Sequence, residues 1–177
     1  MSNKFVIADP AVCIGCKTCM AACLAKHDVP GDVPMPRLNV VFTKTVSAPI
    51  VCRQCADAPC AAACPVGALY QDDATRRVAV REGRCIGCRR CVAACPYGAA
   101  DVASRPVSRA FGNMTLSEGS SPFVVKCDLC VDRPGGPACV AACPTKGCMV
   151  VDEDMLGARA GARVIAKAAP EPAAATA

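Results

Sequence analysis

The sequence predicts a small, loop-rich α+β protein made of two pseudo-symmetric units. Two observations lead to this prediction. The 177 residues include 17 cysteines but only four Phe, two Tyr and no Trp, and the cysteines fall into four groups along the chain. Cores of ordinary density are built around large aromatic and branched side chains. Because Ala, Val and Cys fill little volume, we expect something other than protein to occupy part of the interior.

The cysteine content leaves two classes open, a disulfide scaffold and a metal protein. Residues 1–9 lack the basic and apolar regions of an export signal, and no twin-arginine pair lies near the N-terminus. No apolar run reaches the length of a membrane span. We therefore expect a cytoplasmic protein, in which thiols stay reduced. An odd number of cysteines also fits a fully paired disulfide framework poorly, so metal ligation is favoured.

Sixteen of the cysteines form four groups of four, and Cys148 stands outside them. The first and third groups have the spacing C-x2-C-x2-C-x3-C, whereas the second and fourth have four and eight residues in the middle gap. Pro follows the last cysteine of every group except the first. In chain order the groups are Cys13, Cys16, Cys19 and Cys23; Cys52, Cys55, Cys60 and Cys64; Cys85, Cys88, Cys91 and Cys95; and Cys127, Cys130, Cys139 and Cys143.

This spacing is typical of [4Fe-4S] ligation. Three cysteines at intervals of three wrap a loop around one face of a cubane, and in two-cluster ferredoxins the fourth thiolate comes from the partner motif, where Pro follows it. A structural zinc site needs only four ligands, usually two distant C-x2-C pairs. Three evenly spaced cysteines with a fourth three residues later do not match that pattern. The sequence thus predicts four [4Fe-4S] clusters.

The gaps between groups indicate how the groups pair. Only 20 residues separate Cys64 from Cys85, enough for a short hairpin with strands at 66–70 and 77–80. The second and third groups then form a compact ferredoxin-like unit, and the first and fourth pair across the ends of the chain. Pairing in sequential order remains the alternative. The predicted ligand sets are Cys13, Cys16, Cys19 with Cys143; Cys127, Cys130, Cys139 with Cys23; Cys52, Cys55, Cys60 with Cys95; and Cys85, Cys88, Cys91 with Cys64.

This pairing divides the chain into domains. An outer ferredoxin-like unit comprises 1–48 and 97–154, and an inner unit comprises 49–96. A C-terminal extension, 155–177, is expected to be disordered from about 168 because Ala and Pro dominate it.

The connecting segments have simpler signals. Residues 29–36 hold three Pro and one Gly and predict a surface loop. The β-branched run 38–46 predicts a strand. Gly, Ser and Asn in 106–122 indicate a mobile insert. After Leu156 one helical stretch is expected, with its basic residues on one face.

Several stretches carry a family resemblance: 13–19, 35–38, 52–60, 95–99 and 136–139. They resemble the HydN/HycB type of four-cluster ferredoxin subunit, associated with molybdopterin formate dehydrogenase and formate hydrogenlyase, within the wider family of electron-transfer subunits of molybdopterin oxidoreductases. The resemblance covers residues 3 to about 154. It implies the crossed pairing and an electron-transfer role. The implied partners are a formate dehydrogenase catalytic subunit and a hydrogenase or other ferredoxin-like subunit.

Other classes of function lack support in the sequence. It has no phosphate-binding glycine loop, no Ser/His or paired-carboxylate constellation, and one histidine, His27, expected at the surface. A net charge of +5 without interleaved aromatic residues does not indicate nucleic-acid binding. Clusters held entirely by protein thiolates offer no open iron, so we expect a carrier rather than an enzyme, with any membrane association only through partners.

Two alternatives remain open. One is an assembly or maturation partner of formate dehydrogenase. The other is an iron–sulfur redox sensor, which is disfavoured because no DNA-binding or kinase segment is present. Two further expectations concern single residues. Cys148 is expected to be a small buried residue rather than a ligand. Arg89 and Arg90, between two cysteines of the third group, are expected to be solvated surface residues; the alternatives are that they raise a cluster potential or dock an acidic partner.

Overall fold

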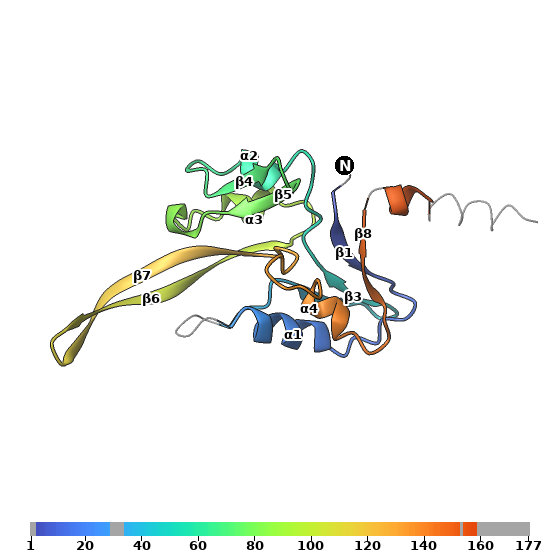
Figure 1. The fold of residues 1–177 in the computed structure, drawn as a ribbon, viewed down its shortest axis with the longest axis horizontal. Helices are drawn as coiled ribbons and strands as arrows, with labels where there is room; N and C mark the ends of the chain where they lie inside the picture. The colour runs from blue at the N-terminus through green and yellow to red at the C-terminus, as the bar shows by residue number, and fades with distance from the viewer. Residues whose placement is uncertain (1–2, 29–33, 153, 159–177) are drawn as a thin grey trace, which may run out of the picture.

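The computed structural model describes residues 3–28, 34–152 and 154–158, and its elements are short apart from one long hairpin (Figure 1). In chain order they are β1 (Phe5–Ala8), α1 (Thr18–Lys26), β2 (Asn39–Phe42), β3 (Ser47–Ile50), α2 (Pro59–Ala62), β4 (Leu69–Asp72), β5 (Arg77–Val80), a 3-10 turn (Glu82–Arg84), α3 (Arg90–Ala94), β6 (Ala100–Phe111), β7 (Met114–Lys126), α4 (Ala138–Ala141) and β8 (Cys148–Val151). This mixture of short helices and strands fits the predicted α+β class.

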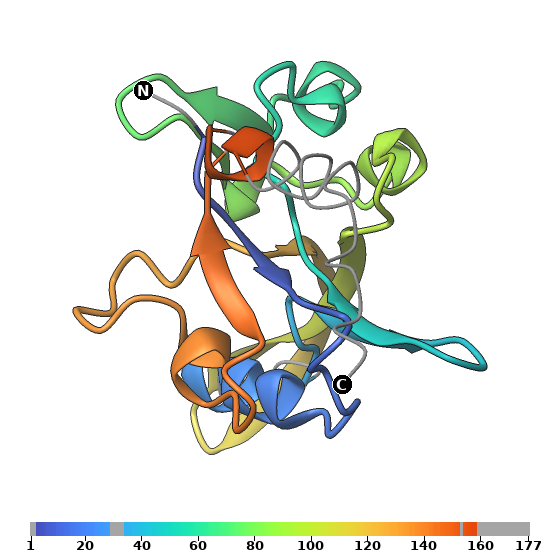
Figure 2. The same cartoon turned by 90° about the vertical axis from the view of Figure 1, so that its right-hand side faces the viewer.

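The strands pair two by two and antiparallel: β1 with β8, β2 with β3, β4 with β5, and β6 with β7. The β1–β8 pair joins the two ends of the described chain, with Phe5 opposite Val151 and Ala8 opposite Cys148. The helices α1 and α4 lie side by side beneath this pair (Figure 2). The N-terminal and C-terminal cysteine groups are therefore neighbours.

Two clusters of buried residues make up the core. The first includes residues of β1, α1, β2, α4 and β8, and six of its ten buried members are cysteines. The second joins α2, α3, β4 and β5, and it also contains Val102 of β6 and Val124 of β7. No aromatic ring is among the fully buried members of either cluster. Thiols and small aliphatic side chains thus form most of the interior.

The segment 106–122, expected to be a mobile insert, is instead the outer part of a long antiparallel hairpin, whose register shifts between Val107 and Ser108. Strands β6 and β7 pair from Ala100 opposite Lys126 to Phe111 opposite Met114, and a two-residue turn closes them. Gly112 in this turn takes φ +59°, a conformation that favours glycine. The arm projects well away from the body (Figure 1). Because solvent reaches both of its faces, the sequence lacks the apolar alternation that marks a half-buried strand.

The other local predictions were met in part. The strand expected over 38–46 ends at Phe42, because the chain turns at 43–46 and returns as β3; there Thr43 N donates to Val46 O (2.8 Å) and Val46 N to Thr43 Oγ1 (3.0 Å). The hairpin between the second and third cysteine groups is confirmed, although β4 begins at Leu69. The chain is helical at 154–158, whereas residues 29–33 and the tail from 159 lie outside the described residues.

The base and the outer arm of the long hairpin should contribute differently to iron content and thermal stability. Val102 and Val124 face each other at its base and are 7% exposed. Replacing 106–120 by Asn-Gly, which joins the opposed residues Arg105 and Ser121, should leave iron content and thermal unfolding midpoint unchanged, because the arm is solvated. Val124→Asp should lower both, because an unpaired carboxylate would be buried. Loss of iron on shortening the arm would contradict this assignment.

Candidate metal centres

Two small cavities are lined by cysteines of different groups. One lies between α1 and the loop after α4, and its thiols are those of Cys13, Cys16, Cys19 and Cys143, joined by Cys148. The other lies beside α3 and contains the thiols of Cys64, Cys85, Cys88 and Cys91. The helices α2 and α3 pack together at the second cavity as α1 and α4 do at the first. Each cavity thus receives its fourth thiol from a distant cysteine group.

The remaining thiols come together in two buried neighbourhoods. Burial raises the pKa of Cys60 to about 11, and the nearby thiols of Cys52 and Cys95 add to the rise. Burial likewise raises the pKa of Cys139 to about 12, with Cys23 and Cys130 among the contributing neighbours. Cys55 lies near Cys52 and Cys95, and Cys127 near Cys139. Cys23, the last cysteine of the first group, therefore lies among thiols of the fourth group. Cys95, the last cysteine of the third group, lies among thiols of the second group.

The backbone around these thiols suits negatively charged sulfur. Amide N–H groups point at Sγ atoms from Arg37 to Cys23 (3.3 Å), from Ala68 to Cys64 (3.2 Å) and from Ala99 to Cys95 (3.3 Å). Burial raises the pKa of Cys64, but the backbone amides of 66–69 outweigh it and the net shift is downward. Such N–H···S bonds are among the means by which proteins tune iron–sulfur clusters. The donor set therefore fits a cluster with thiolate ligands.

Deeply buried thiols without a metal would stay protonated. Burial raises the pKa of Cys127 to about 12, so a free thiolate there would be unstable at neutral pH. A metal cation reverses this preference because a coordinating thiol is deprotonated outright. Desolvated thiols grouped in fours are thus suited to metal ligation and unsuited to nucleophilic chemistry.

The loops that carry the first three cysteine groups share one backbone feature. The residue two positions before the third cysteine has positive φ in the first three groups: Lys17 (+59°), Ala58 (+39°) and Arg89 (+57°). In the fourth group Pro137 stands there with φ −60°. Each such residue precedes a short helix that carries the third cysteine. In the first three groups this left-handed residue turns the chain from the loop into the helix.

Comparison with known proteins decides the family. A model described as a 4Fe-4S dicluster domain matches residues 43–153, and a second model of the same description matches residues 12–69. The chain belongs to the 4Fe-4S dicluster family. The resemblance inferred from the sequence is thereby confirmed, and the thiol cavities belong to iron–sulfur domains.

Curated relatives of this dicluster protein come from Escherichia coli (strain K12). "Electron transport protein HydN" is 45% identical over 161 residues, covering 87% of this chain and 91% of the relative. "Hydrogenase-4 component A" is 40% identical over 177 residues, covering 87% and 85%. "Formate hydrogenlyase subunit 2" is 41% identical over 169 residues, covering 85% and 82%. Within the described residues, no helix is long and apolar enough to cross a membrane.

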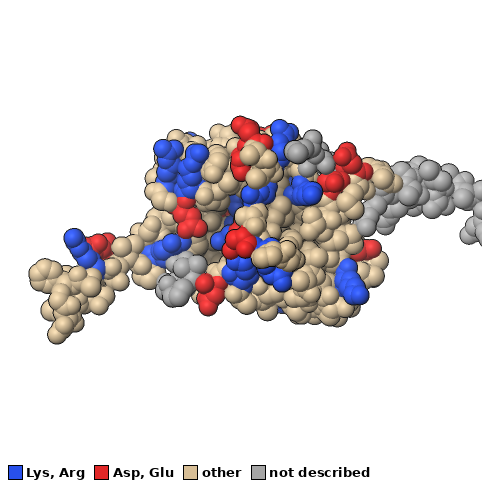
Figure 3. Space-filling view, in the orientation of Figure 1, with Lys and Arg blue, Asp and Glu red and all other residues tan. Residues whose placement is uncertain are grey.

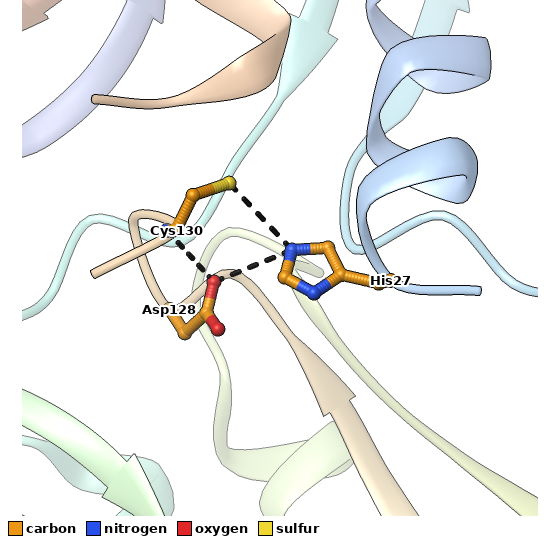
Figure 4. A group of neighbouring side chains, drawn as sticks. All are labelled: His27, Asp128 and Cys130. Atoms are coloured by element: carbon orange, nitrogen blue, oxygen red, sulfur yellow. Dashed lines mark hydrogen bonds and ion pairs between the residues drawn. The ribbon is translucent and has the colours of Figure 1, made fainter. Parts of the chain in front are cut away.

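His27 does not lie at the surface as the sequence suggested. Its side chain is only 9% exposed, and Nε2 lies 3.6 Å from Sγ of Cys130 and 3.5 Å from Oδ1 of Asp128 (Figure 4). Burial, followed by the nearby Arg37, lowers the pKa of His27, so the ring is neutral at pH 7. These three side chains could hold a metal ion together, but Cys130 is already one of the sixteen grouped cysteines. His27 is best described as a hydrogen-bond partner of that sulfur.

A buried polar contact between the second and fourth groups was also missed by the sequence analysis. Gln54, between Cys52 and Cys55, is 0% exposed, and its Nε2 donates to the carbonyl oxygen of Cys127 (2.8 Å). Lys126, next to Cys127, is 2% exposed and donates to Gln54 Oε1 (3.3 Å). No sequence signal marks a buried lysine, since lysine is almost always exposed.

Cys148 is buried, 7% exposed, as expected. It nevertheless lies in the cavity of Cys13, Cys16, Cys19 and Cys143. A hydrogen bond with Cys148 is the main reason that the pKa of Cys19 falls to about 7, and the same bond raises the pKa of Cys148 itself. Cys148 thus lies beside the grouped thiols of this cavity.

Cys148→Ala should therefore leave the iron content unchanged, because four other thiols line the same cavity. The matched control is Cys143→Ala, which removes one of those four and should reduce iron and acid-labile sulfide by one cluster. Both quantities are measured on anaerobically purified protein. A loss of iron in the Cys148 variant would mean that this thiol is a ligand.

Proposed function

We propose that this dicluster protein is an electron carrier with four [4Fe-4S] clusters. It relays electrons from a molybdopterin formate dehydrogenase to a hydrogenase or another ferredoxin-like subunit. The observation that supports the proposal is that two cavities and two buried neighbourhoods each bring thiols of two cysteine groups together. The relatives named as electron transport, hydrogenase and formate hydrogenlyase proteins support the role and the choice of partners.

The proposed ligand sets are those expected from the sequence. The thiol cavities support Cys13, Cys16, Cys19 with Cys143, and Cys85, Cys88, Cys91 with Cys64. The electrostatic neighbourhoods support Cys52, Cys55, Cys60 with Cys95, and Cys127, Cys130, Cys139 with Cys23. When bound, each cubane accepts and releases one electron, so a two-electron donor is drained in two steps.

These sets also favour two pseudo-symmetric units. The outer unit takes 1–48 and 97–154, and the inner unit takes 49–96. The contacts between α1 and α4 and between α2 and α3 support this division. Val102 and Val124 pack in the core of α2 and α3, so we extend the inner unit to the base of the long hairpin.

Exposure and contact support a linear order of the four proposed ligand sets. Cys16 and Cys88 are exposed, whereas most thiols of the other two sets are buried. The thiol of Cys52 lies near that of Cys127, Cys139 lies near Cys19, and Cys60 and Cys91 belong to one core cluster. Two largely buried sets would then stand between two sets that reach the surface. Electrons would enter at one exposed set and leave at the other.

The two exposed ends differ in the number of cations. Both carry an exposed isoleucine, Ile14 (68%) near Cys16 and Ile86 (59%) near Cys88. Near Cys16 the exposed cation is Lys17, which lies over the ring of Phe42.

Three exposed arginines, Arg84, Arg89 and Arg90, surround Cys88, and Figure 3 shows Lys and Arg side chains gathered over the α3 end. Arg89 is held by the carbonyl oxygen of Val102 (3.2 Å). We assign the arginine-rich end to a partner with an acidic surface.

Since every proposed set uses four protein thiolates, no iron is left open to substrate, and we propose no enzymatic site. A cytoplasmic location suits seventeen free thiols. The second candidate, an assembly partner of formate dehydrogenase, needs binding without turnover. It is tested by mixing the protein with formate and the catalytic subunit. Rapid formate-dependent bleaching of the iron–sulfur absorbance supports the carrier, whereas binding without bleaching supports the assembly role.

The cofactor load is the most direct prediction. Protein purified without oxygen should contain about 16 iron and 16 sulfide per chain, because sixteen ligand cysteines divide into four cubanes. Iron and acid-labile sulfide analysis measures this load. About two zinc ions with no sulfide would overturn the proposal.

The arginine-rich end gives a kinetic prediction. Arg90→Gln should slow electron transfer with the partner bound at this end about two- to fivefold at low salt, because one exposed charge pair contributes about 0.5–1 kcal/mol. The difference should shrink at high salt, since screening removes it. Lys44→Gln, which alters an exposed lysine in the β2–β3 turn, is the matched control and should not slow the reaction. Equal effects of the two variants would exclude docking at this end.

A further inference from the structure

Lys126 is an unusual side chain for its position. It is the last residue of β7 and only 2% exposed. Its Nζ donates to the carbonyl oxygens of Val78 (2.6 Å) and Cys127 (3.0 Å) and to Oε1 of Gln54 (3.3 Å). A protonated amine has three N–H donors and a neutral one has two. The three acceptors indicate that Lys126 is a buried ammonium ion.

None of these acceptors carries a charge. Within the described residues, the ion pairs join other side chains, and none of them includes Lys126. A buried cation without a counter-charge is strongly unfavourable, because hydrogen bonds to neutral oxygens replace only part of its hydration. The charge must therefore be balanced by something that these polar contacts do not supply.

The position of Lys126 identifies what balances it. Cys127 follows it directly, and its partner Gln54 lies between Cys52 and Cys55. Gln54 holds the two segments together, since Nε2 donates to Cys127 O (2.8 Å) and Oε1 accepts from Val78 N (3.0 Å). The ammonium thus lies at the seam between the two buried ligand sets.

We propose that Lys126 is the shared counter-charge of the two central clusters and raises their reduction potentials, with Gln54 as the residue that positions it. This inference rests on the proposed function. A cubane with four thiolates is negative and becomes more so on reduction. A cation nearby favours the reduced form, and the effect is large where water is excluded. Exposed cations such as Arg90 are screened and contribute less.

The test is a potentiometric titration of the purified holoprotein, followed by EPR, in the wild type and in three variants. Lys126→Met removes the charge and keeps the length of the side chain. At a fixed potential it should lower the ratio of reduced to oxidised cluster at least about tenfold for two of the four clusters, a shift of about 59 mV for one electron. Lys126→Arg retains the charge and should stay close to the wild type. Lys44→Met is the exposed control and should change nothing.

A fourth variant, Gln54→Glu, covers the case in which Lys126→Met protein does not assemble its clusters. Gln54→Glu keeps the lysine and the size of the side chain but places a carboxylate beside Nζ, so it should lower the same two potentials. If Lys126→Met and Gln54→Glu both lose the two central clusters but Lys126→Arg keeps them, the positive charge itself is required and the proposal holds. If Lys126→Arg loses them too, the site needs the shape of lysine and the proposal fails.

Unchanged reduction potentials in fully loaded Lys126→Met protein would also overturn the proposal. An equal shift in the potentials of all four clusters would overturn it too. These outcomes are separate from a failure of the proposed function, which would appear as a wild-type protein without iron and sulfide. A wild type that carries 16 iron and is reduced by formate, beside variants with unshifted potentials, would refute the role of Lys126 alone.

Discussion

The structure depends on one constraint: thiols from distant parts of the chain must lie together in a protein that has few large side chains. Six of the ten buried residues in the first core cluster are cysteines. Strands β1 and β8 join the ends of the described chain, and α1 meets α4, so the first and fourth cysteine groups become neighbours. The short hairpin β4–β5 does the same for the second and third groups. Secondary structure here mainly holds thiol-bearing loops in position.

The same constraint explains which features could be predicted. The cysteine groups have a spacing tied to one coordination chemistry, so the type of site follows from the sequence. The short gap between Cys64 and Cys85 restricts the chain to a hairpin, and that hairpin is present. In contrast, the arm of β6 and β7 has no buried face outside its base, so the pattern of apolar residues carries no strand signal. The turn at 43–46 was not predicted for a different reason: β-branched residues continue through it.

Contacts between residues far apart in the chain could not be predicted from the sequence. His27 reaches Cys130 from 103 positions away, and Gln54 reaches Cys127 from 73. Neither residue belongs to a periodic pattern or a known spacing, and neither is a residue type that usually forms a core. Only the folding of one cysteine loop against another brings them to a sulfur or to a backbone carbonyl. The type of site could therefore be predicted from the cysteine spacing, but the side chains that surround the thiols could not.

Burial changes along the molecule in a way that suits a relay. The sets that contain Cys16 and Cys88 reach the surface, where partners can approach and where salt screens nearby charges. The proposed central sets are more enclosed, and Lys126 is buried beside them, where little water screens a charge. In the proposed arrangement a charge at Lys126 would influence potentials in the middle of the line, whereas charges such as Arg90 would influence encounter at its end. Separating these effects in space would allow the partner surface to change without altering the central potentials.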